Sequence, residues 1–333
     1  MSDFDMRNKP DLIVIAGPTA SGKTAVAVRL AEFLNGSGRN CEIIGADSMQ
    51  IYRELSIGTA KPAPDETHGI PHHMIDVASI ADAIINPFSV ADYVSMAGKI
   101  ADDIISRGKI PIVCGGTGLY IDHLIAGTTF TDTALHDDAY RESLAKLSND
   151  DLHAKLTAVD PESAAAIHPN NRKRVIRSLE IYHLSGSAKS ALDKASVPAE
   201  PRYNAMKFVL TFGDRDKLYS RIDARTDKMI AGGFIDEVAL LRNDGYEEHL
   251  RRVGAIGYPE ILDYLGNNYI SGEKITLEQT TAFIKQHTRN YAKRQITWFA
   301  KDKSAEFIES DDETPESYSY YNKICEKVEI LKK

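Results

Sequence analysis

The chain has 333 residues, 43% hydrophobic and 26% charged, which suffices for one large domain with an appendage or for two domains. No apolar run approaches the roughly 20 residues of a membrane span, and the polar N-terminus is not typical of a signal peptide. Three scattered cysteines offer neither a metal site nor a disulfide framework, and a net charge of -8 argues mildly against a nucleic-acid partner. We therefore expect a cytoplasmic monomer with no membrane partner.

Strands and helices are predicted to alternate in the first part of the chain. Five apolar runs are typical of strands, and they lie at 11–17, 41–47, 72–77, 110–118 and 206–213. Segments with helical spacing follow the first run and precede the fourth, and Ser89 followed by Asp92 predicts the start of the second of these helices. Strands joined through helices imply an α/β fold with a parallel sheet flanked by helices.

The pattern changes after Ile125, because every segment from there to about Tyr203 predicts a helix. We interpret this stretch as an all-helical insertion between the fourth and fifth strands. The predicted organisation has four parts: 1–125, the first part of the core; 126–203, the helical insertion; 204–303, the rest of the core with a helical C-terminal part; and 304–333, a polar, poorly patterned tail.

A phosphate-binding loop is predicted between the first strand and the first helix. The motif GPTASGKT has the spacing of a P-loop, and it comprises Gly17, Pro18, Thr19, Ala20, Ser21, Gly22, Lys23 and Thr24. Its backbone N–H groups and the following helix N-terminus suit phosphate oxygens. Lys23 supplies a point charge, and the Thr24 hydroxyl is placed for Mg²⁺, which we expect as the cofactor. The fold class is thus α/β of the P-loop NTPase type.

Asp47 follows the second strand and is the best-placed acid near this loop. The fourth strand instead runs into CGGTGLY, whose glycines favour either close approach to a ligand or a structural turn. Asp47 is followed by polar groups able to contact a ligand, in the run Ser48, Met49 and Gln50. Three roles are open to Asp47: holding a metal through water, capping a turn, or accepting a proton.

Eight motifs in series carry a resemblance to a known family. They are GPTASGKT, DSMQIYR, GTAKP, PHHMID, FSVADY, GGTGLY, AIGYPE and TRNYAKRQITWF, in this order. Together they resemble the tRNA dimethylallyltransferases over roughly residues 12–300. The resemblance implies a P-loop core with a helical insertion, Mg²⁺ dependence and dimethylallyl diphosphate as donor. The partner that it implies is the anticodon stem-loop of tRNA.

The resemblance also implies a reaction, transfer of a dimethylallyl group to N6 of the adenine 3′-adjacent to the anticodon. The P-loop would then hold a diphosphate leaving group, and Asp47 would be the general base. Either Arg221 or Arg225, which share one helical face, would contact the diphosphate; the alternative is surface pairing with neighbouring aspartates. The run Asp47 to Gln50 would hold the extruded base, with the Gln50 amide both donating and accepting, and Thr117 would contact the RNA.

Local basic segments offer an acidic chain a way to hold tRNA. The first is the start of an insertion helix, with the expected tRNA-binding residues Asn170, Asn171, Arg172, Lys173 and Arg174. The second is a stripe of Lys285, Arg289 and Lys293, which is either a solvated face or a contact to the tRNA backbone. The aromatic residues near that stripe, Tyr291 among them, are more typical of a core anchor.

Three alternatives compete with this interpretation. A P-loop kinase acting on a small hydroxyl compound would share the strand, loop and helix, with Asp47 as its base. A prenyltransferase acting on free adenine nucleotide is disfavoured, because it has little use for the basic insertion helix. A nucleotide-dependent binding switch without chemistry would not require Asp47 and the polar residues after it.

Overall fold

The computed structural model describes residues 10–130, 137–266, 269–270, 273–309 and 318–328. The chain divides into two compact units: Met1–Ile125 with Tyr203–Lys333, and Ala126–Arg202. The first unit contains the sheet and the C-terminal helices, and the second contains the segment predicted as a helical insertion. No helix among the described residues is long and apolar enough to cross a membrane.

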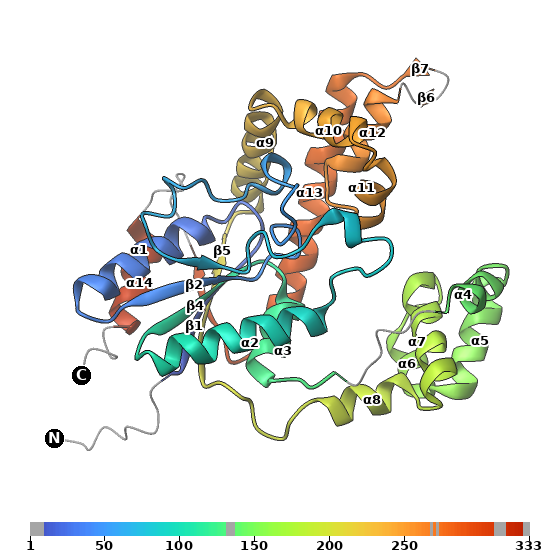
Figure 1. Cartoon of the computed structure of the whole chain (residues 1–333), viewed down its shortest axis with the longest axis horizontal. Helices are drawn as coiled ribbons and strands as arrows, with labels where there is room; N and C mark the ends of the chain where they lie inside the picture. The colour runs from blue at the N-terminus through green and yellow to red at the C-terminus, as the bar shows by residue number, and fades with distance from the viewer. Residues whose placement is uncertain (1–9, 131–136, 267–268, 271–272, 310–317, 329–333) are drawn as a thin grey trace. The chain divides into compact units, whose positions relative to one another are not determined.

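A parallel sheet of six strands forms the centre of the first unit (Figure 1). The strands are β1 Leu12–Ala16, β2 Cys41–Gly45, β3 His72–His73, β4 Ile110–Gly115, β5 Ala205–Thr211 and β8 Glu306–Glu309. They pair in the order β3-β2-β4-β1-β5-β8, and every pair is parallel. All five residues of β1 and of β2 are buried, as expected of strands covered on both faces. The α/β prediction is confirmed.

Helices cover both faces of this sheet (Figure 1). On one face α1 (Lys23–Gly36) packs against alternate residues of the strands, including Ile13, Ile43 and Ile112. On the other lies α2 (Val90–Ser106), whose Tyr93 ring stacks 4.1 Å from the Tyr120 ring of α3 (Gly118–Ala126). The predicted Ser89 and Asp92 capping box is present at the start of α2.

The expectation of a poorly patterned tail over 304–333 is wrong for the described residues. β8 extends the sheet beside β5, and α14 (Tyr318–Val328) packs against α1. Ile324 and Val328 are fully buried in the same core as α1, and the Tyr321 ring meets Phe33 edge-on. A four-residue strand is too short for its alternation of apolar and polar residues to be recognised. The polar residues of α14 are interspersed among its apolar ones, so the apolar face is not evident in the sequence.

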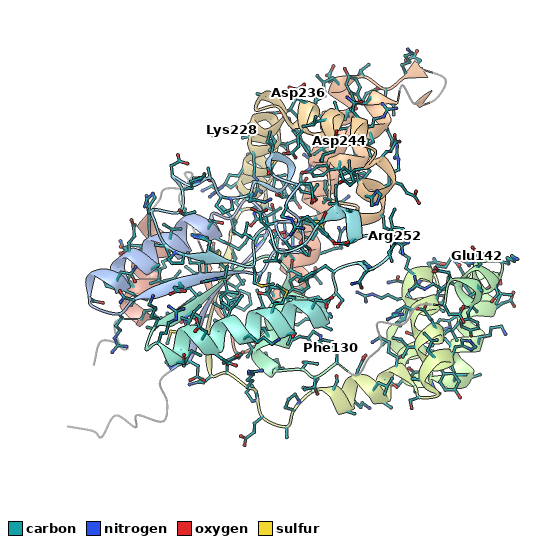
Figure 2. The ribbon with its side chains drawn as sticks, in the orientation of Figure 1. Phe130, Glu142, Lys228, Asp236, Asp244 and Arg252 are labelled. Atoms are coloured by element: carbon teal, nitrogen blue, oxygen red, sulfur yellow. The ribbon has the colours of Figure 1, made fainter. Side chains whose placement is uncertain are left out.

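Five helices follow β5 and pack around a second apolar core. They are α9 Arg215–Ala231, α10 Phe234–Asn243, α11 Glu247–Val253, α12 Tyr258–Leu265 and α13 Leu277–Phe299, with the hairpin strands β6 Tyr269–Ile270 and β7 Glu273–Lys274 after α12. The helix α9 lies beside α13, where Leu218 and Ile222 bury against Ala292. The labelled Lys228 and Asp236 mark the end of this group that is farther from the sheet (Figure 2).

The unit Ala126–Arg202 is helical and has its own core. Its helices are α4 Asp138–Ala145, α5 Asn149–Val159, α6 Pro161–Ala166, α7 Arg172–Ser185 and α8 Lys189–Ser196. Leu152, Leu156 and Val175 are fully buried between α5 and α7. Glu180 is buried in α7, where the cations of Arg141 and Arg177 hold the pKa of its carboxyl below its usual range although burial raises it.

Candidate functional site

The P-loop connects β1 to α1 at the carboxyl end of the sheet. Gly17 and Gly22 have positive φ angles of 148° and 86°, in the region that favours glycine. A Cβ atom on Gly17 would lie 2.7 Å from the Leu210 carbonyl oxygen, so the loop can pass β5 only without a side chain there. The conformation of this loop therefore requires glycine at both positions.

Lys23 points back into the loop that precedes it. Its Nζ donates to the Pro18 carbonyl oxygen at 2.7 Å. Burial, together with the nearby Arg225, lowers the pKa of Lys23 from 10.5 to about 8, whereas Cys114 and Asp47 oppose the shift. A diphosphate in the loop would place negative charge beside this ammonium, whose hydrogen-bond partner is a neutral carbonyl.

Two cavities meet at the P-loop. The larger, of about 460 Å³, is lined by Lys23, Thr24 and Gln50, and we call it the phosphate pocket. The smaller, of about 230 Å³, is lined by apolar side chains such as Met229, Phe234 and Ile284, and we call it the apolar pocket. Five residues line both cavities and so mark the junction between them: Thr19, Ala20, Asp47, Arg225 and Tyr291.

Asp47 is held at this junction by the turn that follows β2. Its Oδ1 accepts hydrogen bonds from the Met49 N–H at 2.8 Å and the Gln50 N–H at 3.3 Å. The turn-capping role considered for Asp47 is therefore present. Because the same carboxylate lines both cavities, capping and chemistry are compatible, with Oδ1 holding the turn and Oδ2 available to a ligand.

Thr117 fixes the residues on either side of Asp47. The Thr117 N–H donates to the Ala46 carbonyl oxygen at 3.0 Å, and the Ser48 N–H donates to Thr117 Oγ1 at 3.1 Å. A Cβ atom on Gly115 would lie 2.1 Å from the Ala46 oxygen, so close approach of two backbones requires this glycine. The glycines after β4 thus serve the contact with the Asp47 turn.

The amide of Gln50 is engaged inside the protein. Its Nε2 donates to the carbonyl oxygens of Thr59 and Ala60, at 3.1 and 3.0 Å. Both amide hydrogens are used inside the protein, so Oε1 is the group that a ligand in the phosphate pocket can meet, as an acceptor. The expectation that this amide also donates to a base stays a prediction, and it would require one of these two hydrogen bonds to break.

The loop that anchors Gln50 is clamped by Glu237 of α10. The carboxylate of Glu237 accepts from three consecutive backbone N–H groups, at 3.2, 2.7 and 3.3 Å, those of Ser56, Ile57 and Gly58. The Tyr258 hydroxyl donates to the same carboxylate at 2.5 Å. Gly58 and Thr59 line the apolar pocket, so Glu237 shapes its wall from outside.

The two arginines of α9 have different surroundings. Arg225 lines both cavities, and its Nη1 donates to Thr19 Oγ1 of the P-loop at 3.2 Å. Burial lowers the pKa of Arg225, and Asp47 and Glu66 oppose the shift. Arg221 stacks on the Phe212 ring, 5.1 Å from its centroid. Of the pair, Arg225 is the one that the structure brings to the P-loop.

The phosphate pocket has oxygen donors suited to Mg²⁺. Thr24, Asp47 and Glu66 line it. Within the described part of the chain, no group of three or more His, Cys, Asp or Glu side chains is placed to hold a metal ion. Mg²⁺ is commonly bound by one or two protein oxygens together with phosphate and water. The residues therefore fit a Mg²⁺ ion coordinated jointly by protein oxygens and a bound diphosphate, rather than a metal held by protein alone.

The predicted basic stripe of α13 faces α9. Lys285 pairs with Asp227 at 2.7 Å, and Arg289 pairs with Asp223 at 2.6 Å. Lys293 lies over the Tyr219 ring. These cations connect α13 to α9. Because they are paired with groups of α9, the stripe has little unpaired positive charge for a tRNA backbone.

The predicted tRNA-binding residues of the insertion divide into two groups. Arg172 turns inward, since its guanidinium donates to the carbonyl oxygens of Leu144 and Ala145 at the end of α4, and Asn170 accepts from Asn149. Lys173 and Arg174 are exposed in the first turn of α7.

Sequence reasoning missed several side chains around the two cavities. Tyr291, interpreted as a core anchor, lines both cavities, and burial raises its pKa to about 12. Gln295 reaches the P-loop, and Glu66 enters the phosphate pocket from a loop. One signal was available, because Thr288, Tyr291 and Gln295 recur at i, i+3 and i+7 and share one helix face.

Comparisons with known proteins agree on one family. The sequence model of the IPP transferase family matches residues 50–302. A tRNA dimethylallyltransferase of Geobacter sulfurreducens is 42% identical over 306 residues, 91% of this chain and 93% of that protein. The crystal structure of a Bacillus halodurans tRNA isopentenylpyrophosphate transferase matches with a TM-score of 0.66 and 39% identity, over 97% of this chain and 98% of that one.

A eukaryotic dimethylallyltransferase acting on tRNA matches with a TM-score of 0.77 and 26% identity, over 96% of this chain and 79% of that one. The family model covers more than half of the chain, and the Geobacter relative aligns over nearly all of it. The resemblance inferred from the eight motifs is confirmed. The chain therefore belongs to the IPP transferase family, a family of prenyltransferases.

Proposed function

We propose that this protein transfers a dimethylallyl group from dimethylallyl diphosphate to N6 of the adenine 3′-adjacent to the anticodon of tRNA. One observation supports the proposal: Asp47 and Arg225 line both the phosphate pocket and the apolar pocket. A donor with an anionic head and a short hydrocarbon would place its reacting carbon at that junction. The names of the relatives support tRNA as the acceptor.

The reaction would break a carbon–oxygen bond and form a carbon–nitrogen bond. The bond between C1 of the allyl group and the diphosphate oxygen breaks, and its electron pair leaves with the oxygen. The N6 lone pair of adenine forms the new bond to C1, and the N6 proton passes to the Asp47 carboxylate. The products are the N6-dimethylallyl adenine, diphosphate and protonated Asp47.

The leaving diphosphate would lie in the P-loop. Lys23, Arg225 and the backbone N–H groups would stabilise the charge that develops on its oxygens. Mg²⁺, shared with Thr24, would add positive charge to the same oxygens. The apolar pocket would exclude water from the reacting carbon, which protects the allyl group from hydrolysis.

The adenine must leave its stack to reach Asp47, at a cost of about a few kcal/mol. We propose that the turn from Asp47 to Gln50 receives the base and that Thr117 lies beside it. Lys173 and Arg174 of the insertion would bind tRNA phosphates. These contacts would bring the acceptor to a protein whose overall charge is negative.

The proposal is tested by mixing the protein with Mg²⁺, dimethylallyl diphosphate and unmodified tRNA, and then weighing the nucleosides after digestion. An adenosine heavier by one C₅H₈ unit is expected. Phosphorylated product from labelled ATP and small hydroxyl acceptors, with no prenylated adenosine, would show a kinase instead.

Asp47→Asn isolates the proton transfer, since its amide oxygen still accepts from Met49 and Gln50 while its basicity is lost. We expect turnover to fall by about 10²-fold or more, with tRNA affinity within a few-fold of normal. An equal loss of tRNA affinity and turnover would make Asp47 a structural residue.

A further inference from the structure

Gln295 of α13 connects two loops of the site that are far apart in sequence. Its Oε1 accepts from the Thr19 N–H of the P-loop at 2.8 Å, and its Nε2 donates to the Gly116 carbonyl oxygen at 2.9 Å. Only 5% of the residue is exposed. A buried amide bonded at both ends to the backbone has one orientation and fixes both of its partners.

On the P-loop side, Gln295 controls the peptide plane that faces Lys23. The Thr19 N–H and the Pro18 carbonyl belong to one planar unit. Gln295 holds the nitrogen of this plane, and Lys23 Nζ donates to its oxygen at 2.7 Å. A rotation of the plane would therefore move the lysine that meets the diphosphate.

On the other side, Gln295 controls the peptide plane that leads into Thr117. The Gly116 carbonyl and the Thr117 N–H again share one plane, and that N–H donates to Ala46. Thr117 Oγ1 accepts from Ser48, so the threonine holds the residues on both sides of Asp47.

The glycine at position 116 makes room for this contact. A Cβ atom there would lie 2.2 Å from Gln295 Nε2, so a side chain would displace the amide. The GGTG sequence thus fits the glutamine as well as the Asp47 turn.

We propose that Gln295 is a positioning residue that holds Lys23 and Asp47 in register, so that the bound diphosphate and the amine that Asp47 deprotonates meet at one reacting carbon. This inference rests on the proposed prenyl transfer. A single side chain meets both peptide planes, and a shift on either side changes the distance between leaving oxygen and base. Displacements of about 1 Å can cost 10²-fold in rate.

Two variants test the proposal, with Gln286→Met as the matched control, because Gln286 is exposed on the same helix. Gln295→Met removes both hydrogen bonds at similar length. We expect kcat per folded protein to fall at least tenfold and the Kd for inorganic diphosphate to rise several-fold. The Kd for tRNA should stay within about twofold, and the control should match the wild type.

Gln295→Glu adds a readout that a purely structural role would not move. A protonated carboxyl can donate to Gly116 and accept from Thr19, whereas a carboxylate can only accept. Burial raises the pKa of such a carboxyl, although nearby Lys23 and Arg225 oppose the rise. The ratio of variant to wild-type kcat should therefore increase as the pH is lowered from 8.5 to 6, and the ratio for Gln295→Met should stay flat.

The proposal is overturned if Gln295→Met keeps kcat within twofold, or if the Gln295→Glu ratio does not change with pH. If the wild-type protein forms no prenylated adenosine, the proposed function is refuted instead. The diphosphate affinities of the variants would then still decide whether Gln295 positions the P-loop.

Discussion

The pKa of Lys23 leads to a quantitative prediction for diphosphate binding. At a pKa of about 8, this lysine is mostly charged at pH 7 and mostly neutral at pH 9. If the diphosphate requires the charged form, the share of binding-competent protein falls about tenfold between these two values. Below pH 7 the lysine is fully charged, and no further gain is expected.

The assay is a calorimetric titration of inorganic diphosphate with Mg²⁺ at several pH values, on the wild type and on Lys23→Met. The diphosphate has ionisations of its own, but these cancel in the ratio of the two Kd values. The advantage of the wild type should shrink about tenfold from pH 7 to pH 9. A ratio that is constant through pH 9.5 would refute a lysine pKa near 8.

The lowered pKa of Lys23 also makes the free energy of unfolding depend on pH. In the unfolded chain the lysine keeps its ordinary pKa of 10.5, so the folded protein binds fewer protons between pH 8 and pH 10.5. The cost of burying the ammonium is complete below pH 8 and fades above it. As the pH is raised from 8 to 10.5, the free energy of unfolding of the wild type should therefore rise relative to that of Lys23→Met. The expected rise is at most about 3 kcal/mol, reduced by any screening by water.

Three further experiments test other parts of the protein. Glu237→Ala should lower the free energy of unfolding by about 2–4 kcal/mol, because three backbone N–H groups lose a charged acceptor; an unchanged urea midpoint would contradict the clamp. Arg225→Lys should weaken diphosphate binding at least tenfold and Arg221→Lys less than threefold, and the reverse order in calorimetry would exclude our choice between them. Replacing Lys173 and Arg174 by Gln should reduce the salt dependence of tRNA binding by roughly one phosphate contact each, and an unchanged slope would place the tRNA elsewhere.

Local patterns predicted the parts of the site that are local in sequence. The P-loop and Asp47 were found because strand, glycines and charged residue follow one another within a few positions. Gln295 was not found, because its partner Thr19 lies 276 residues away and only the fold brings them together. The choice of Arg225 over Arg221 likewise depended on which guanidinium meets the P-loop, since helical spacing places both on one face.

Charge patterns proved less informative than contacts. The stripe on α13 and the start of α7 both contain cations at regular spacing, yet the aspartates of α9 pair with Lys285 and Arg289, whereas Lys173 and Arg174 are exposed. A cation already paired with a carboxylate gains little from a phosphate, because one attraction replaces another. A net charge of -8 is therefore compatible with tRNA binding only where basic residues extend from the surface without such partners, and sequence spacing does not reveal where that is.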